Sequence, residues 1–577
     1  MKPLMLALAI LWAPAALAAQ DSVSVIVIDP TVPFGEPGRQ SGPPQAVLEE
    51  AVAAYNDSAT IRFAGDVVVP HGTVLRGRFG LFRGTMRVHG TIDGPVTVLN
   101  GDLIVEPGGA VHGDALIVGG MLLVRPDGVH SGTARSFVES APVTRQVSGL
   151  LAIRARGRSI PQASASFQSG DLRTTLRLTT GHTYNRVEGL PIQFGPLFEW
   201  RPSPGARVEL DLQGILRTAP DESNLRRDFG YATQLEWRRT TLPIIGIGVT
   251  AQSEMRAIEE HPLSAVESGW SAFLLQRDYR DLFEAQGFGG YGYLQPTRGF
   301  RIDIGLRRDN ERSVRESDPW SLFRNSDRWR ANPLIDDGHF LTADVTMSLD
   351  TRHSRDSGAS GWWVQAVYQY GESEDVAPIT LPTSIRSPIP IDGSYDFSRL
   401  QVDARRYFRL SPGSRVRLRL LAAGWLGGDP LPIQRRYSLG GPGLLPGYEF
   451  RHLTCTPSGV PNSGRTAFCD RMALVQGEFR TRLRLGAASR ILERAHLGVQ
   501  GMIGLDEADL VFFTDMGMAW LSGDGPGRVP NDRLPSLDLW KADVGVGLDL
   551  GGLGVYLAKA LTDGEPVRLT ARLEHRF

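Results

Sequence analysis

Long segments in the C-terminal part of the chain alternate apolar and charged residues with a period of two. In Val416-Arg-Leu-Arg-Leu420 the apolar side chains face one way and the guanidinium groups the other, and Glu478-Phe-Arg-Thr-Arg-Leu-Arg-Leu485 repeats the pattern. Only a β-strand separates two such sets. In a soluble sandwich the charged face lies in water, whereas in a membrane barrel it lines a polar lumen. The residues of this basic face are Arg415, Arg417, Arg419, Arg480 and Arg484.

Strand-like segments continue at barrel spacing over residues 150–577. They number about sixteen, from 170–181 to 566–577, and bacterial single-chain barrels have an even number. No run after residue 20 has the ~18 consecutive apolar residues of a membrane helix. The sequence therefore predicts an all-β fold whose main part is a transmembrane antiparallel β-barrel.

A glycine-rich segment from Tyr437 to Arg451 lies between two of these strands. Its glycines and prolines sustain neither a helix nor a β-ladder, so it is a loop with a demanding backbone path. A later strand, Phe512 to Trp520, places Asp515 opposite its large apolar residues. The residues of the loop motif are Gly440, Gly441, Gly443, Pro446, Gly447 and Tyr448.

These features resemble the bacterial surface antigen superfamily, the BamA/TamA-like outer-membrane barrels of assembly and secretion. The resemblance places Leu445-Pro-Gly-Tyr448 at the family's loop motif, Glu478 on the following strand and Asp515 on the next. In that family a loop arginine folds into the lumen and pairs with these acids. Pro446 stands at the arginine position here, so we expect Arg451, or else Arg482, to supply the cation, and Tyr448 to pack inside the barrel.

Other stretches extend the resemblance over about 400 residues. Tyr184-Asn-Arg-Val-Glu-Gly-Leu190 is similar to the opening strand of such barrels, and Asp350-Thr-Arg352 with Gly361-Trp362 to a hairpin in the middle of the barrel. The last residues alternate and end on an aromatic residue, which resembles the recognition strand of outer-membrane proteins. The residues of this signal are Leu573, His575 and Phe577. The basic face also predicts a cationic lumen that prefers anions.

The start of the chain reads as a secretory signal peptide over residues 1–18, with a short apolar core and a small-residue cleavage site at Ala16-Leu-Ala18. The two cysteines, Cys455 and Cys469, lie in one loop of an exported chain. Such a pair predicts a disulfide, and two free thiols are the alternative. A net charge of −1 argues against a nucleic-acid partner.

Residues 19–60 combine a strand, a linker and a short helix over residues 45–55. Residues 61–140 then carry an imperfect repeat of 18 to 23 residues, with echoes such as Val88-His-Gly90 and Val111-His-Gly113. Such repeats must stack on one another to bury their apolar sides. They predict a small β-solenoid that resembles the polymer-forming bactofilins. An ordinary small β-sandwich is the alternative.

No local pattern pairs a nucleophile with a base or offers ligands for a metal with an open position. We therefore expect no catalytic residues, no metal, no cofactor and no enzyme activity. The resemblance implies a protein of the bacterial outer membrane with a periplasmic N-terminal module, acting in outer-membrane protein assembly or translocation. Its expected partners are outer-membrane lipid, the assembly machinery, and unfolded outer-membrane proteins or periplasmic factors. The alternative is a passive channel or an anchoring barrel tethered by the solenoid, since no helix–strand repeats of the family's client-recruiting domains precede the barrel.

Overall fold

The computed structural model describes most of the chain from residue 45 onward. The described residues are 45–120, 122–137, 141, 143–145, 150–153, 162–180, 184–203, 205–219, 228–239, 242–259, 263–297, 299–324, 328–351, 360–376, 394–411, 413–452, 455, 468–483, 508–524, 528–550, 553–573 and 576–577. The predicted signal peptide, the residues up to 44, Arg352, Arg484 and His575 lie outside them. Among the described helices, none is long and apolar enough to cross a membrane.

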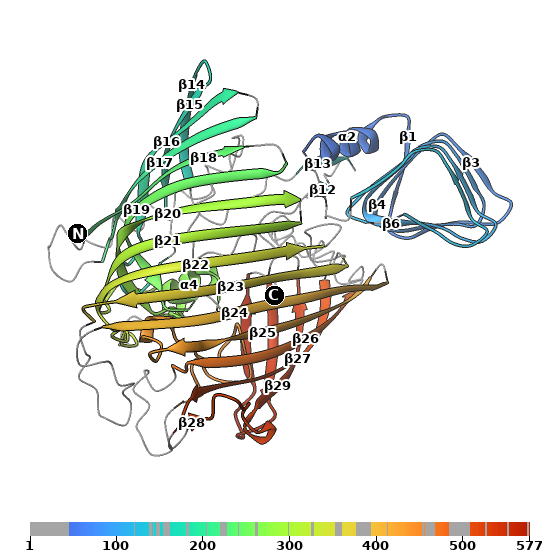
Figure 1. Cartoon of the computed structure of the whole chain (residues 1–577). Helices are drawn as coiled ribbons and strands as arrows, with labels where there is room; N and C mark the ends of the chain where they lie inside the picture. Colours follow the sequence, from blue (N-terminus) through green and yellow to red (C-terminus); the bar gives the residue numbers. More distant parts are fainter. Residues whose placement is uncertain are drawn as a thin grey trace.

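The N-terminal module is a β-solenoid whose strands pair in parallel from one turn to the next. Phe79 pairs with Val96, and Val96 with Ala115, so the register advances first by 17 residues, one less than the predicted range of 18 to 23, and then by 19, within that range. Its cross-section is triangular (Figure 1). The strands are β1 (Thr60–Ala64), β2 (Val67–Val69), β3 (Val74–Arg76), β4 (Arg78–Val88), β5 (Thr91–Asp93), β6 (Val96–Val105), β7 (Ala110–His112), β8 (Ala115–Val118), β9 (Leu122–Val124), β10 (Val129–Ser131) and β11 (Ala134–Phe137).

Two features hold the solenoid together. Inside the triangle, valine, leucine and isoleucine side chains such as Val98 and Ile117 are fully buried. At one corner glycines stack, because a Cβ at Gly94 (φ +144°) would lie 1.9 Å from the carbonyl oxygen of Gly77. The predicted helix is present as α2 (Gln45–Asn56) and covers an outer face together with the hairpin of β12 (Val143–Arg145) and β13 (Leu151–Ile153).

The rest of the described chain forms one sheet of eighteen strands that follow one another in sequence. The two-residue β28 pairs in parallel with β27, and the other seventeen strands pair antiparallel. The strands are β14 (Gln162–Ser169), β15 (Leu172–Thr179), β16 (Ile192–Ser203), β17 (Ala206–Leu216), β18 (Phe229–Arg239), β19 (Ile244–Ala257), β20 (Leu282–Thr297), β21 (Phe300–Ser313), β22 (Gly338–Asp350), β23 (Gly361–Ser373), β24 (Tyr395–Ser411), β25 (Ser414–Gly428), β26 (Arg471–Leu483), β27 (Ala508–Ser522), β28 (Arg528–Val529), β29 (Lys541–Asp549), β30 (Gly554–Ala560) and β31 (Arg568–Arg572).

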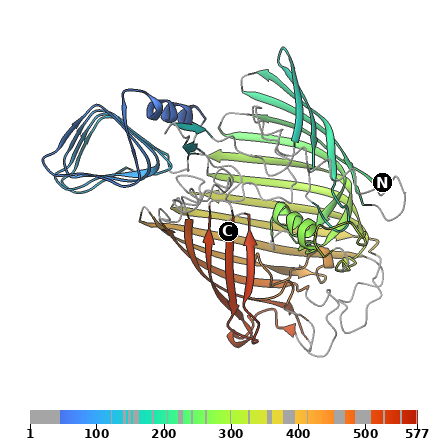
Figure 2. The ribbon, with the colours of Figure 1, turned by 180° about the vertical axis from the view of Figure 1, so that it is seen from behind.

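The sheet curls into a barrel with inverted polarity (Figures 1 and 2). Leu418 and Leu420 on β25 are 44% and 48% exposed, while Arg417 and Arg419 between them are buried. Strands with apolar residues outside and charged residues inside are the pattern of a transmembrane barrel. The predicted fold class, a transmembrane antiparallel barrel preceded by a β-solenoid, is confirmed.

Three local predictions are wrong. Residues 184–190 form a turn rather than a strand: Asn185 and Gly189 (φ +69°) bridge each other, and the Asn185 side chain accepts the N–H groups of Val187 and Glu188. The last strand ends at Arg572, not at Phe577. The sequence analysis also missed β14, whose alternation of Ala163, Ala165 and Phe167 with polar residues is weak because two of its three apolar side chains are alanines.

One helix inside the barrel region was not predicted either. Helix α4 (Ala265–Leu275) lies in the connection between β19 and β20. Ser264 accepts the N–H of Glu267, the first half of a capping box. Short 3₁₀ turns occur at η1 (Ile433–Arg435) and η3 (Leu537–Leu539).

Candidate functional site in the barrel lumen

The glycine-rich loop is buried inside the barrel. Its apolar side chains, among them Leu444 and Leu445, share a core with Leu421 of β25 and Leu474 of β26. The loop, which follows η1 and precedes β26 in the sequence, therefore lies inside the lumen. Little of its own surface contacts water.

Two glycines allow this path. Gly440 has φ +114°, and a Cβ there would lie 2.4 Å from the carbonyl oxygen of Glu449. A Cβ at Gly447 would lie 2.7 Å from both the backbone nitrogen of Ala560 and the Cβ of Asp543. Larger residues at these positions would collide with the backbone of Glu449 in the same loop, with the start of β29 and with the end of β30. Gly441 (φ +93°), Gly443 and Pro446 complete the buried motif.

Hydrogen bonds fix the tip of the loop to the last strands. The Gly447 N–H donates to the Asp543 carboxylate at 2.7 Å. The hydroxyl of Tyr448, which is 2% exposed, lies 3.1 Å from the carbonyl oxygen of Ala542 and 2.7 Å from the Thr562 hydroxyl. The side chain of Tyr448 thus lies inside the barrel, against β29 and the turn after β30.

The two acids of the family motif find other partners than the sequence predicts. Glu478 lies beside Arg480 of its own strand and 3.4 Å from Arg417 of β25. Asp515 pairs with Arg576. Neither Arg451 nor Arg482 reaches these acids among the described contacts, and Arg482 is exposed. The prediction that one of these two replaces the missing loop arginine is therefore wrong, because strand neighbours and the chain end already neutralise both carboxylates.

Arg451 instead joins a buried cluster at the other side of the loop. It has φ +58°, and its side chain pairs with Glu259 at 3.4 Å and with Asp281. Asp281 also pairs with Arg186 and, at 2.7 Å, with Arg330. We call Arg186, Glu259, Asp281, Arg330 and Arg451 the loop cluster.

The loop cluster connects four segments that are far apart in the sequence. Its carboxyl groups respond differently to burial. Burial raises the pKa of Glu259 against the opposing effect of Arg451 and Ser438. Burial also acts on Asp281, but the guanidinium groups of Arg451, Arg330 and Arg186 outweigh it and hold that pKa well below its usual range. Asp281 therefore stays ionised as the common anion of three arginines.

The basic face of the barrel wall is largely neutralised. Arg415 pairs with Asp509, Arg419 with Asp403 at 2.8 Å, and Arg480 with Asp549 at 2.5 Å in addition to Glu478. The prediction of a strongly cationic lumen is thus wrong for these arginines, and the predicted anion preference loses their support. The sequence carries a signal for the missing acids, because Asp509 and Asp549 have the same strand parity as Asp515 and Asp543.

The C-terminal residues also turn inward. Leu573 follows the end of β31 and donates its N–H to Glu267 of α4 at 2.8 Å. Phe577 is buried, and its main-chain oxygen lies 3.4 Å from Arg417. The expected alternation of Leu573, His575 and Phe577 along a wall strand is therefore not observed, because the described part of this segment leaves the sheet at Arg572.

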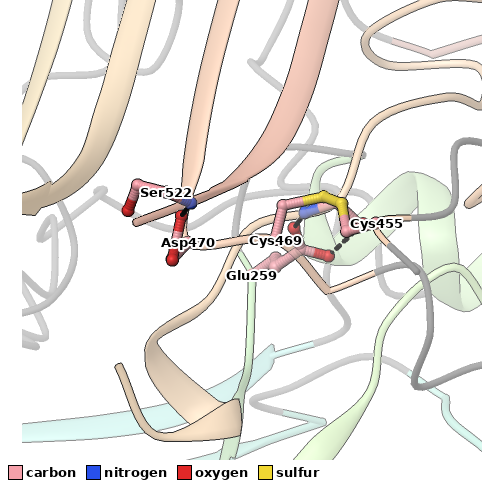
Figure 3. The surroundings of a disulfide bond; sticks show 6 residues. Glu259, Cys455, Cys469, Asp470 and Ser522 are labelled. Carbon is pink, nitrogen blue, oxygen red and sulfur yellow. Dashed lines mark hydrogen bonds between the residues drawn. A yellow bond between two sulfur atoms is a disulfide. The ribbon is translucent and has the colours of Figure 1, made fainter. Parts of the chain in front are cut away.

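The disulfide between Cys455 and Cys469 is present, with the two Cα atoms 5.6 Å apart. Figure 3 shows Glu259 beside it, and Asp470 accepting the N–H of Ser522 at 2.8 Å. Cys469 also exchanges two backbone hydrogen bonds with Tyr437. The disulfide thus links Cys455 to the segment before β26. The two hydrogen bonds of Cys469 then link that segment to the start of the glycine-rich loop.

We expect thiol labelling of the denatured, unreduced protein to detect no free cysteine. Chain-entropy reasoning assigns a bridge of this length about 3 kcal/mol of stabilisation. Reduction should therefore lower the urea midpoint of the purified barrel. A Cys455→Ser, Cys469→Ser double variant, measured with and without reductant, is the control and should not respond. Labelling of both thiols in the unreduced wild type would contradict the bond.

Comparison with known proteins finds a family match for part of the barrel. Residues 291–552 match the Omp85 superfamily domain. Among solved structures, BamA from Haemophilus ducreyi, lacking POTRA domains 1–3, aligns with a TM-score of 0.39 and 11% identity over 72% of this chain and 75% of that one. CdiB from Acinetobacter baumannii (TM-score 0.29, 10% identity) and from Escherichia coli (TM-score 0.30, 9% identity) align over 71% of this chain.

The alignment spans just under two-thirds of the two CdiB chains, 64% and 66%. A search of curated proteins finds no significant match. The matched domain begins in β20 and ends after β29, so it includes the glycine-rich loop and the strands that carry Glu478 and Asp515. The part of the wall that holds the loop therefore matches the Omp85 superfamily domain.

Proposed function

We propose that this protein assembles polypeptides into the outer membrane or translocates them across it, with the solenoid as its periplasmic module. The observation that carries the proposal is the pair of sheet ends within the described chain. There β14 pairs only with β15, and β31 only with β30. A strand edge without a neighbour can accept another strand by main-chain hydrogen bonds. The Omp85 domain supports the same class of function.

The filled lumen argues against the alternative function, a passive channel. The glycine-rich loop occupies the interior, and the wall arginines Arg415, Arg419 and Arg480 are engaged in ion pairs. A general diffusion channel needs a water-filled path through the barrel. The filled lumen therefore favours a barrel that works at its sheet ends over one that works through its pore.

The lengths of most connections support a periplasmic position for the solenoid. Turns such as the one between β24 and β25 are short, whereas the connections at the opposite end, such as β19–β20 and β25–β26, are long. Outer-membrane barrels have short turns on the periplasmic side. Arg409, close to the β24–β25 turn, pairs at 2.7 Å with the buried Asp102 of the solenoid, and Figure 1 shows the solenoid at that end of the barrel.

We expect Asp102→Arg to detach the solenoid from the barrel, because it places two cations against each other. Protease added to the periplasmic side should then release a folded solenoid fragment faster than from the wild type. The Asp102→Arg, Arg409→Asp double variant restores opposite charges and should recover resistance. Glu106→Arg, which alters a solenoid acid paired within its own module, is the matched control. Equal cleavage of all four proteins would contradict the docking.

Two measurements test the function. Depletion of the protein should lower the amounts of specific outer-membrane or secreted proteins, and the purified protein in liposomes should increase the folding rate of such a client. Planar-bilayer recordings of the same preparation should show little steady conductance. A large steady conductance together with an unchanged outer-membrane protein profile would favour the channel alternative.

A further inference from the structure

Helix α4 lies between the two ends of the strand order. On one side, Glu267 of α4 holds Arg572 of β31 with contacts of 2.8 and 3.1 Å. On the other side, Phe273 packs edge-on against Tyr184, with ring centroids 5.4 Å apart, and Asp278 pairs at 3.0 Å with Arg186. Tyr184 and Arg186 belong to the connection from β15 to β16. In Figure 2 the helix is seen in the open side of the curled sheet.

The helix has the polarity of the barrel wall, not that of a helix in water. Its one charged residue, Glu267, is buried together with Ser268, Gly269 and the small apolar Val266 and Ala272, whereas the larger Trp270 and Leu275 are 48% and 43% exposed. A surface helix of a soluble protein buries its apolar stripe and exposes its charges. Here the charged side faces the protein and the aromatic side faces outward.

A neighbouring segment extends the exposed apolar surface. Trp320, Leu322 and Phe323 are 41%, 44% and 56% exposed. The N–H groups of Leu322 and Phe323 donate to the carbonyl oxygens of Phe273 and Leu274, and the Trp320 ring contacts the Phe273 ring at 5.8 Å. We call Trp270, Leu275, Trp320, Leu322 and Phe323 the aromatic patch.

We infer that the aromatic patch is a lipid-binding surface that closes the gap between the two sheet ends against the bilayer. Exposed apolar side chains on the two edge strands, Phe167 of β14 and Leu569 of β31, belong to the outer surface of the barrel on either side of the gap. The aromatic patch is likewise apolar and exposed, and it extends the apolar surface of these strands across the gap. Its two tryptophans lie towards the end with the long connections, and tryptophan is favoured at membrane interfaces.

Lipid also explains why polar groups are withdrawn from this surface. Facing water, five large apolar side chains would be costly, since apolar area in water is unfavourable. Facing lipid, the same residues have no such cost, and the buried Glu267–Arg572 pair is shielded from the hydrocarbon. The inference depends on the barrel being embedded in a membrane, but not on its function in assembly.

Site-directed spin labelling tests the inference on the full-length protein in liposomes. Both native cysteines are paired, so Trp270→Cys, Leu275→Cys and Phe323→Cys each introduce a single free thiol. Two further labels calibrate the measurement. Leu418→Cys on the outer wall reports lipid, and Leu534→Cys, 72% exposed in the connection before β29, reports water.

Lipid contact predicts that labels in the patch collide with oxygen more than with a water-soluble nickel chelate, as at Leu418. Collision dominated by the chelate, as at Leu534, would overturn the inference. Low accessibility to both reagents would overturn it as well, because it would identify a protein partner on the patch. If Leu418 itself reports water, the membrane embedding fails instead, and the two failures are thereby distinguished. Three separate positions keep the test valid if one variant fails to fold.

Discussion

Replacing Asp281 by asparagine is expected to destabilise the folded barrel by about 3–5 kcal/mol, the usual cost of removing one partner of a buried ion pair. Asp281 is the shared anion of Arg186, Arg330 and Arg451, and the side chains of Arg186 and Asp281 are fully buried. The neutral amide leaves three guanidinium groups with less negative charge among them. Their mutual repulsion then acts on the β15–β16, β19–β20 and β21–β22 connections and on the glycine-rich loop together.

The expected result can be measured by urea unfolding of the barrel refolded in liposomes, followed by heat-modifiable mobility on gels. The pKa of Asp281 is depressed, so its contribution is present above the ordinary carboxylate range and is lost only as pH falls through the lower value. Wild type should therefore keep its stability on mild acidification, and the difference from the variant should persist. Asp532→Asn, at an exposed position, is the matched control. An Asp281→Asn barrel as stable as this control would show that the cluster is not structural.

The strands could be predicted from the sequence because each carries its own signal. Every second residue is charged from Arg415 to Arg419 on β25 and from Glu478 to Arg482 on β26, and a one-residue error in register would expose these arginines to lipid. The alternation therefore determines both the strands and their inner faces. β14 carries only a weak form of that signal, since Gln162 to Ser169 has no charged residue and a single large apolar one, Phe167, and its place depends on pairing with β15.

The partners inside the lumen could not be predicted in the same way. Strand parity shows that Glu478 and Asp515 face inward, but the choice of cation depends on which segments meet in three dimensions. Arg480 is only two residues from Glu478 and adjoins it on the same face, while Arg576 arrives because the chain leaves the sheet after Arg572. The positive φ of Arg451 directs that residue to Glu259 instead.

Helix α4 could be predicted from the sequence only in part. Ser264-Ala-Val-Glu267 is a capping-box pattern and was available in the sequence. The inverted polarity of the helix conceals it from a search for an amphipathic segment, because its environment is decided by the sheet ends on either side.

A double-mutant cycle decides between the predicted and the observed partner of Glu478. Glu478→Ala alone is expected to cost about 3–5 kcal/mol, because it leaves the buried Arg480 and Arg417 without this anion. Combined with Arg480→Ala, the two losses should be non-additive by about 0.5–3 kcal/mol, as for residues in direct contact.

Combined with Arg451→Ala, the losses should add within about 0.5 kcal/mol, since Arg451 contacts Glu259 and Asp281 instead. The same urea titrations in liposomes provide all the free energies of unfolding. Coupling of Glu478 to Arg451 but not to Arg480 would mean that Arg451 takes the role of the family's loop arginine from a shifted position. The glycine-rich loop would then be held by its ion pair with the strand acid. Coupling to Arg480 alone would mean that the wall neutralises its own acid. The loop would then be retained by Gly447, Tyr448 and the loop cluster, and not by the acids of β26 and β27.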